Sequence, residues 1–163
     1  MAMFRLRTDA EAWFGEIERS PHIRSKFDLY YFCLMAGFAS GRSDETHLTN
    51  ATSKEFIDYF IDDYKPASRL LIGQLVIAEM KYKGIDVAEK AAVRALFKEL
   101  VDANNGNNSL TDHGMKRMNA YASGGFDYLA EQRDTKPVYM DAFLRDFVGI
   151  VDEAREAALS VAS

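Results

Sequence analysis

The chain has 163 residues, of which 48% are hydrophobic and 28% charged. This composition is typical of a globular rather than a disordered protein and predicts one domain over residues 1–163. The net charge of −5 argues against a general polyanion binder, because neutralising phosphates requires concentrated Lys and Arg, but it does not exclude a local basic patch. The single cysteine, Cys33, cannot form an internal disulfide, and the amino-terminal residues lack the apolar run of a signal peptide, so we expect a cytoplasmic location.

Two helices are predicted in the first 42 residues. Thr8 and Glu11 have the spacing of a capping box, and apolar residues recur at helical spacing until Ser20-Pro21. The stretch FDLYYFCLMAGFASGR, residues 27–42, is apolar on nearly all sides, which is typical of a helix buried at the centre of a bundle. Its apolar run is about half of the roughly 20 residues that a membrane-spanning helix needs, so we expect no membrane span.

Three further helices are predicted between residues 52 and 102. The first begins at Thr52 or Ser53 and ends before Pro66, with aromatic and aliphatic residues inward and Asp58, Asp62 and Asp63 toward solvent. The second covers residues 67–83 and ends at Gly84, a frequent glycine position at helix carboxyl ends. The third begins at the capping pair Asp86 and Glu89.

The last part of the chain predicts two more helices. The loop NNGNNS precedes a helix that starts at Ser109 or Thr111, and Pro137 is expected near the first turn of the final helix. No strand is predicted. The expected fold is therefore all-α, a single compact bundle of about six to seven helices around a central, nearly all-apolar helix.

No set of metal-ligating or catalytic residues converges in the sequence. The segment DANNGNNSLTDH, which starts at Asp102, has Asn107 and His113 where a calcium-binding EF-hand loop needs its turn glycine and bidentate glutamate. His22, His47 and His113 lack the paired spacing of zinc ligands, and Cys33 lies in the apolar stretch, where a thiol packs as a small hydrophobe. We therefore expect no metal, no cofactor and no catalytic residue, and favour a protein that is not an enzyme.

Two groups of residues are candidates for contacts with other molecules. Asp58 and Asp62 lie one helical turn apart in the predicted acidic helix, while Gly124 and Gly125 in mid-helix each cost about 1 kcal/mol relative to alanine and so predict close approach of a neighbouring helix or partner backbone. The candidate protein-interaction residues are Asp58, Asp62, Asp63, Tyr121, Gly124, Gly125 and Tyr128. The candidate nucleic-acid contacts are Lys81, Lys83, Arg94, Lys98, Lys116 and Arg117, but Asp86 and Glu89 at the start of the would-be recognition helix disfavour direct DNA binding.

Two blocks carry a family resemblance. FDLYYFCLMAGFASGR and MNAYASGGFDYLAEQ, in this order, resemble small helical accessory proteins encoded beside bacterial DNA phosphorothioation and phage-defence systems, in which an apolar helix ending in a Gly-Phe-x-x-Gly-Arg-like corner precedes a glycine-rich late helix. The resemblance implies a role in a multi-protein DNA-modification or defence assembly, and it assigns no catalytic residue.

The leading hypothesis is a non-enzymatic accessory protein that binds protein partners. The alternatives are a regulatory nucleic-acid-binding protein and a helical domain that binds a small ligand between helices, bordered by Tyr30, Tyr31, Asp58 or His113. A homodimer is expected if one face of the apolar helix stays uncovered within the monomer.

Overall fold

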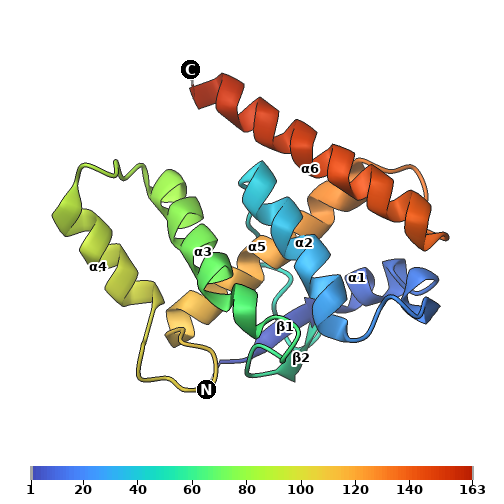
Figure 1. Ribbon diagram of the computed structural model, residues 1–163, viewed down its shortest axis with the longest axis horizontal. Coiled ribbons are helices and arrows are strands. Elements are labelled where there is room, and N and C mark those ends of the chain that lie inside the picture. The colour runs from blue at the N-terminus through green and yellow to red at the C-terminus, as the bar shows by residue number, and fades with distance from the viewer. Residues whose placement is uncertain (1, 163) are drawn as a thin grey trace.

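The computed structural model describes residues 2–162 and is mostly helical (Figure 1). In Figure 1, α2 and α5 lie in the middle of the molecule, α3 and α4 lie to their left, the small sheet lies below, and α6 crosses the upper right. The described elements are β1 (Phe4–Arg7), α1 (Thr8–Trp13), η1 (Ile17–Arg19), α2 (Lys26–Ser40), β2 (Ser53–Ile57), η2 (Lys65–Ala67), α3 (Ser68–Lys83), α4 (Lys90–Leu100), α5 (Asp112–Glu131) and α6 (Met140–Ala162).

A two-stranded antiparallel sheet replaces the helix predicted from residue 52. β1 pairs with β2 so that Phe4 lies opposite Ile57 and Arg7 opposite Ser53. The spacing of apolar residues after Ser53 fits a helix, but the stretch also contains aromatic and β-branched residues that pack well on a pleated surface, and β1 supplies the hydrogen-bonding edge. The predictions of a helix over this segment and of a fold without strands are therefore wrong.

The backbones of α2 and α5 touch at glycines. A Cβ atom on Gly125 would lie 1.8 Å from the Cys33 carbonyl oxygen, and one on Gly37 would lie 2.0 Å from the Tyr121 carbonyl oxygen. A Cβ on Gly124 would lie 2.6 Å from the Arg42 carbonyl oxygen, in the chain just beyond α2. This close packing offsets the helix-propensity cost of two adjacent glycines in α5.

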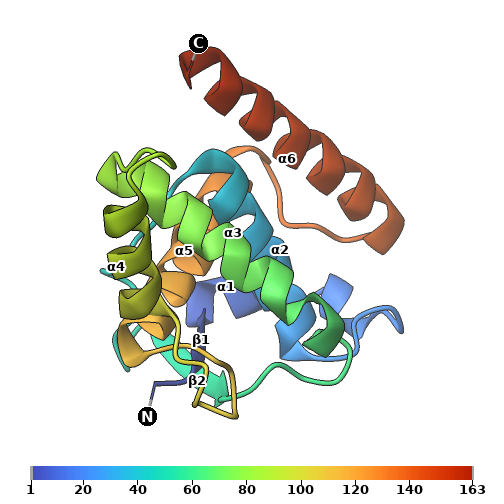
Figure 2. The same cartoon turned by 60° about the vertical axis from the view of Figure 1, so that its left-hand side comes forward.

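Helix α6 packs against one side of α2 and extends the hydrophobic core there. Phe143 and Phe147 of α6 each place their rings 5.0 Å from the ring of Phe32, and Phe143 is fully buried. Beyond Ala154 the packing ends, since every residue from 155 to 160 is exposed. Figure 2 shows the carboxyl-terminal half of α6 standing clear of the other helices, as Figure 1 also does.

Three helix boundaries differ from or refine the predictions. α4 begins at Lys90, because Asp86 and Glu89 instead form a turn in which their carboxylates accept hydrogen bonds from Ala88 N (2.9 Å) and Asp86 N (3.0 Å). Pro137 precedes α6 rather than lying in its first turn. Thr111 caps α5 by accepting a hydrogen bond from Gly114 N at 2.9 Å.

Candidate functional site

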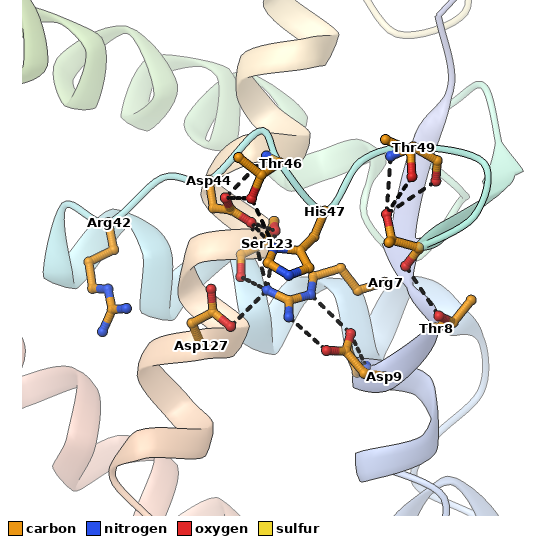
Figure 3. A network of polar contacts seen from close by, with 12 residues as sticks. Arg7, Thr8, Asp9, Arg42, Asp44, Thr46, His47, Thr49, Ser123 and Asp127 are labelled. Atoms are coloured by element: carbon orange, nitrogen blue, oxygen red, sulfur yellow. Dashed lines mark hydrogen bonds and ion pairs between the residues drawn. The ribbon is translucent and has the colours of Figure 1, made fainter.

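The most elaborate polar cluster surrounds Arg7 at the end of β1 (Figure 3). The Arg7 side chain is 5% exposed, and its Nη2 lies 2.7 Å from Asp9 at the start of α1. Its Nη1 lies 2.8 Å from Asp127 of α5 and 3.9 Å from Asp44 in the segment after α2. One guanidinium thus joins the sheet, two helices and a loop.

Asp44 fastens its loop to α5. Its backbone N–H donates to the Ala120 carbonyl at 2.9 Å, and its carboxylate accepts from Ser123 Oγ at 2.9 Å and lies 2.6 Å from His47 Nδ1 (Figure 3). Burial alone would raise the pKa of Asp44, but hydrogen bonds from Thr46, His47 and Ser123 outweigh it and hold that pKa well below its usual range. The ionised carboxylate is therefore the form that holds the loop.

Asp44, His47 and Asp127 bring potential metal ligands within 4.8 Å of one another. The Arg7 guanidinium, however, already lies between the two carboxylates, at the position where a cation would neutralise them. A metal ion would have to displace a buried, permanently charged side chain. We interpret the cluster as an ion-pair clamp between elements.

The same cluster does not have the hydrogen-bond arrangement that activates a catalytic nucleophile. Ser123 donates to the carboxylate of Asp44 rather than to the His47 ring, and the nitrogen near its hydroxyl is Arg7 Nη1 at 3.4 Å, which cannot accept a proton. The buried thiol of Cys33 is no substitute, because burial raises its pKa far above the usual value and keeps it protonated.

A second buried ion pair joins α3 to α5. Arg117 Nε lies 2.6 Å from Glu79, whose side chain is 1% exposed, while its Nη atoms bond Glu45 at 3.1 Å and Ser43 at 3.1 Å. The Arg117 guanidinium also lies 4.8 Å from the centre of the Tyr82 ring. Both clusters therefore attach the loop that follows α2 to the helices beneath it.

The predicted nucleic-acid contacts divide into two sets. Arg117 is buried in its ion pair with Glu79, so it is not available for a surface contact with nucleic acid. Lys116 Nζ lies 3.8 Å from the carboxylate of Glu45. Lys83 pairs with Glu99 at 3.0 Å. The other three, Lys81, Arg94 and Lys98, are exposed and form no ion pair with any residue that the structure describes.

The predicted protein contacts are scattered rather than brought together. Tyr121, Gly124 and Gly125 are buried between α2 and α5, so they offer no surface to a partner, and Tyr128 is half-buried. Asp58 is partly buried and accepts a hydrogen bond from Asn107 at 3.1 Å. Asp62 and Asp63 remain exposed in the segment before η2, paired with Lys65 at 3.1 Å and Arg24 at 3.7 Å.

An apolar groove that the sequence does not reveal lies between α2 and the start of α6. It has a volume of about 390 Å³ and is lined by His22, Ile23, Asp28, Tyr31, Phe32, Tyr64, Met140, Asp141 and Leu144. Of the four residues expected to border a ligand pocket, only Tyr31 lies here: Tyr30 is buried and donates to Asn119 at 2.9 Å, and His113 is exposed at the start of α5. The groove residues come from four separate segments, so no local spacing could predict them.

Comparisons with protein-family models, with curated proteins and with solved structures give no match. Among the described residues, no helix combines the length and apolarity needed to cross a bilayer. The two arginine clusters explain how the loop after α2 is held, whereas the groove leaves room for another molecule.

Proposed function

We propose that the protein is a non-enzymatic accessory module whose groove between α2 and α6 binds an amphipathic helix of a partner protein. The observation that carries the proposal is that apolar side chains continue from the groove along one side of α6 without cover. Leu144 is 39% exposed and Val148, one turn further on, is 57% exposed, while Val138 and Tyr139 just before the helix are 54% and 72% exposed. Exposed apolar side chains beside a groove are typical of a protein-interaction surface.

The floor of the groove is rigid, which favours specific docking. The Tyr64 ring lies 4.6 Å from that of Phe27 and 5.5 Å from that of Tyr31, and its hydroxyl donates to Asp28 at 2.5 Å. Asp28 is itself fixed, because it accepts a hydrogen bond from the backbone N–H of Arg24 at 2.7 Å. Aromatic side chains that are already fixed in the floor of the groove lose less conformational entropy when a partner binds.

The charge around the groove favours a partner helix with basic residues. Asp141 lines the groove and is 83% exposed, and Asp62 and Asp63, immediately before Tyr64, are 92% and 49% exposed. Their ion pairs with Lys65, Arg24 and Arg145 lie at the surface, where such pairs contribute little and can exchange for a partner's cations.

A non-enzymatic role also agrees with the use of the polar interior. Arg7 pairs with Asp9, Asp44 and Asp127, and Arg117 pairs with Glu79, so these ion pairs hold elements of the fold together. The proposal takes α2 as the central helix of the fold, because Leu29, Leu34 and Ala36 are buried on different sides of it. We further propose that the partner belongs to a DNA-modification or phage-defence assembly, a proposal supported by the resemblance to accessory proteins of such systems.

Site-specific photo-crosslinking tests the proposal. A photoreactive residue placed at Leu144 in the source organism should crosslink to one partner segment, whereas the same residue at Ile77, a 55% exposed position on α3, should not. The crosslinked segment, made as a peptide, should be an amphipathic helix with basic residues. It should bind the Leu144→Asp variant at least tenfold more weakly than the wild type and the Ile77→Asp variant as tightly as the wild type.

Two outcomes would contradict this function. Equal crosslinking from Leu144 and Ile77 would show that the groove has no special role. Crosslinking from Leu144 only to a second copy of the chain would assign the surface to a homodimer instead.

A further inference from the structure

We propose that the outer face of α4 binds the backbone of single-stranded nucleic acid, through Lys90, Arg94 and Lys98, with Phe97 stacking on a base. This contact is separate from the groove, since α4 and the start of α6 lie on opposite sides of the molecule in Figures 1 and 2. The role therefore goes beyond partner binding at the groove, and either proposal can fail while the other holds.

The three cations form a regular row on an exposed helix face. They lie four residues apart, so successive charges are separated by about 6 Å along the helix axis. α4 uses its opposite side for packing, where Leu96 and Leu100 are 2% and 0% exposed. The row therefore lies on the solvent-exposed side of a packed helix, and Figure 1 shows that α4 forms an outer edge of the molecule.

The row also lacks internal partners. Most Lys and Arg side chains in the described part of the chain form ion pairs, but Lys90, Arg94 and Lys98 form none there. The nearby carboxylates form no ion pair with the row among the described residues: Glu99 pairs with Lys83 at 3.0 Å, and Glu89 and Asp86, which keep their negative charge, accept backbone hydrogen bonds in the turn before α4. Three unpaired like charges on one face repel one another, and a polyanion relieves that repulsion.

Phe97 favours nucleic acid over an acidic protein as the occupant. Its ring is 50% exposed and lies on the same face, three residues after Arg94 and directly before Lys98. A basic row with an exposed aromatic ring is the combination by which proteins hold single strands, because cations follow the phosphates and the ring stacks on a base. A carboxylate-bearing helix would use the cations but gain little from the ring.

Fluorescence anisotropy with a labelled 20-nucleotide oligo(dT) tests this contact on the full chain. At 50 mM salt the wild type should bind, and log K should fall with log salt at a slope of about −2, which corresponds to three phosphate contacts on a single strand. The variant K90Q/R94Q/K98Q should bind at least tenfold more weakly. Phe97→Ala should weaken binding about fivefold or more while leaving the salt slope unchanged.

The matched control is K54Q/K136Q/R155Q, which removes the same charge from exposed positions on other segments that form no ion pair among the described residues. This control should bind oligo(dT) within about twofold of the wild type, and circular dichroism should show that both triple variants are folded. Absence of binding at 50 mM salt, or an equal loss in the control, would overturn the proposal. Tighter binding of a glutamate-rich helical peptide, or equal duplex binding without an effect of Phe97→Ala, would overturn it as well.

Discussion

At the scale of single residues, Gly125 sets the distance between α2 and α5. A methyl group there would overlap the Cys33 carbonyl oxygen, and backbone atoms cannot move aside as a flexible side chain can. Gly125→Ala should therefore lower the free energy of unfolding by about 2 kcal/mol or more, an overpacking effect. Gly149→Ala in α6 is the control, because its Cβ meets nothing within 4 Å and should add about 1 kcal/mol of helix propensity.

Chemical denaturation of both variants measures this difference. Opposite signs for the two glycines would support the close approach of α2 and α5, and equal small effects would contradict it.

Asp44 makes a residue-scale prediction about pH. Its pKa is lower in the folded chain than the value of about 3.9 expected when unfolded, so its contribution to stability is present above pH 4 and is lost as the pH falls through the folded pKa. Asp44→Asn should lower the free energy of unfolding by about 2 kcal/mol at pH 7, as expected for lost hydrogen bonds to a charged group. The gap between wild type and variant should shrink below pH 4.

Urea denaturation between pH 3 and pH 7 checks this dependence. Asp62→Asn, at a 92% exposed carboxylate, should change stability by less than about 0.5 kcal/mol at pH 7. A constant gap between wild type and Asp44→Asn across the whole range would argue against an ionised Asp44 in the loop.

At the scale of elements, α6 has two halves with different roles. Phe143 and Phe147 bind it to α2, whereas residues 155–160 are all exposed. Truncation after Ala154 should therefore change the free energy of unfolding by less than about 1 kcal/mol. Truncation after Tyr139 removes the buried ring of Phe143 and should destabilise the chain by about 3 kcal/mol or more. Thermal unfolding of the two truncated chains measures this difference. An equal loss of stability on truncation after Ala154 and after Tyr139 would contradict the division of α6 into two halves.

Elements with a long helical period could be predicted from the sequence, whereas the site could not. Residues 68–83 and 112–131 keep the helical spacing of apolar residues over several turns. Gly84 marks the carboxyl end of the first helix, and Thr111 marks the start of the second. Residues 53–57 follow no such rule, because their apolar pattern fits a helix until β1, distant in sequence, supplies a pairing edge. The Arg7 cluster depends on the same long-range pairing. Its only local signal is the polar run Asp44-Glu45-Thr46-His47, which by itself reads as an ordinary loop.

At the scale of the whole molecule, charge and apolar surface are divided between distinct regions. The buried arginine clusters hold the loop after α2 against α5. The groove and the start of α6 expose apolar side chains beside carboxylates, and α4 exposes cations that form no ion pair in the described part of the chain. Under the two proposals made above, the groove would bind a basic partner helix and α4 a nucleic acid, on opposite sides of the molecule.

The mass of the complex formed in cells of the source organism tests the groove most directly. Val148 and Ile77 are 57% and 55% exposed, so an aspartate at either position should affect solubility similarly, but only Val148 lies one helical turn from the groove residue Leu144. The wild-type chain and Ile77→Asp should migrate in a native complex heavier than the purified chain alone, and Val148→Asp should migrate as the free chain. An identical mass for the wild type and Val148→Asp in the lysate would contradict partner binding at the groove.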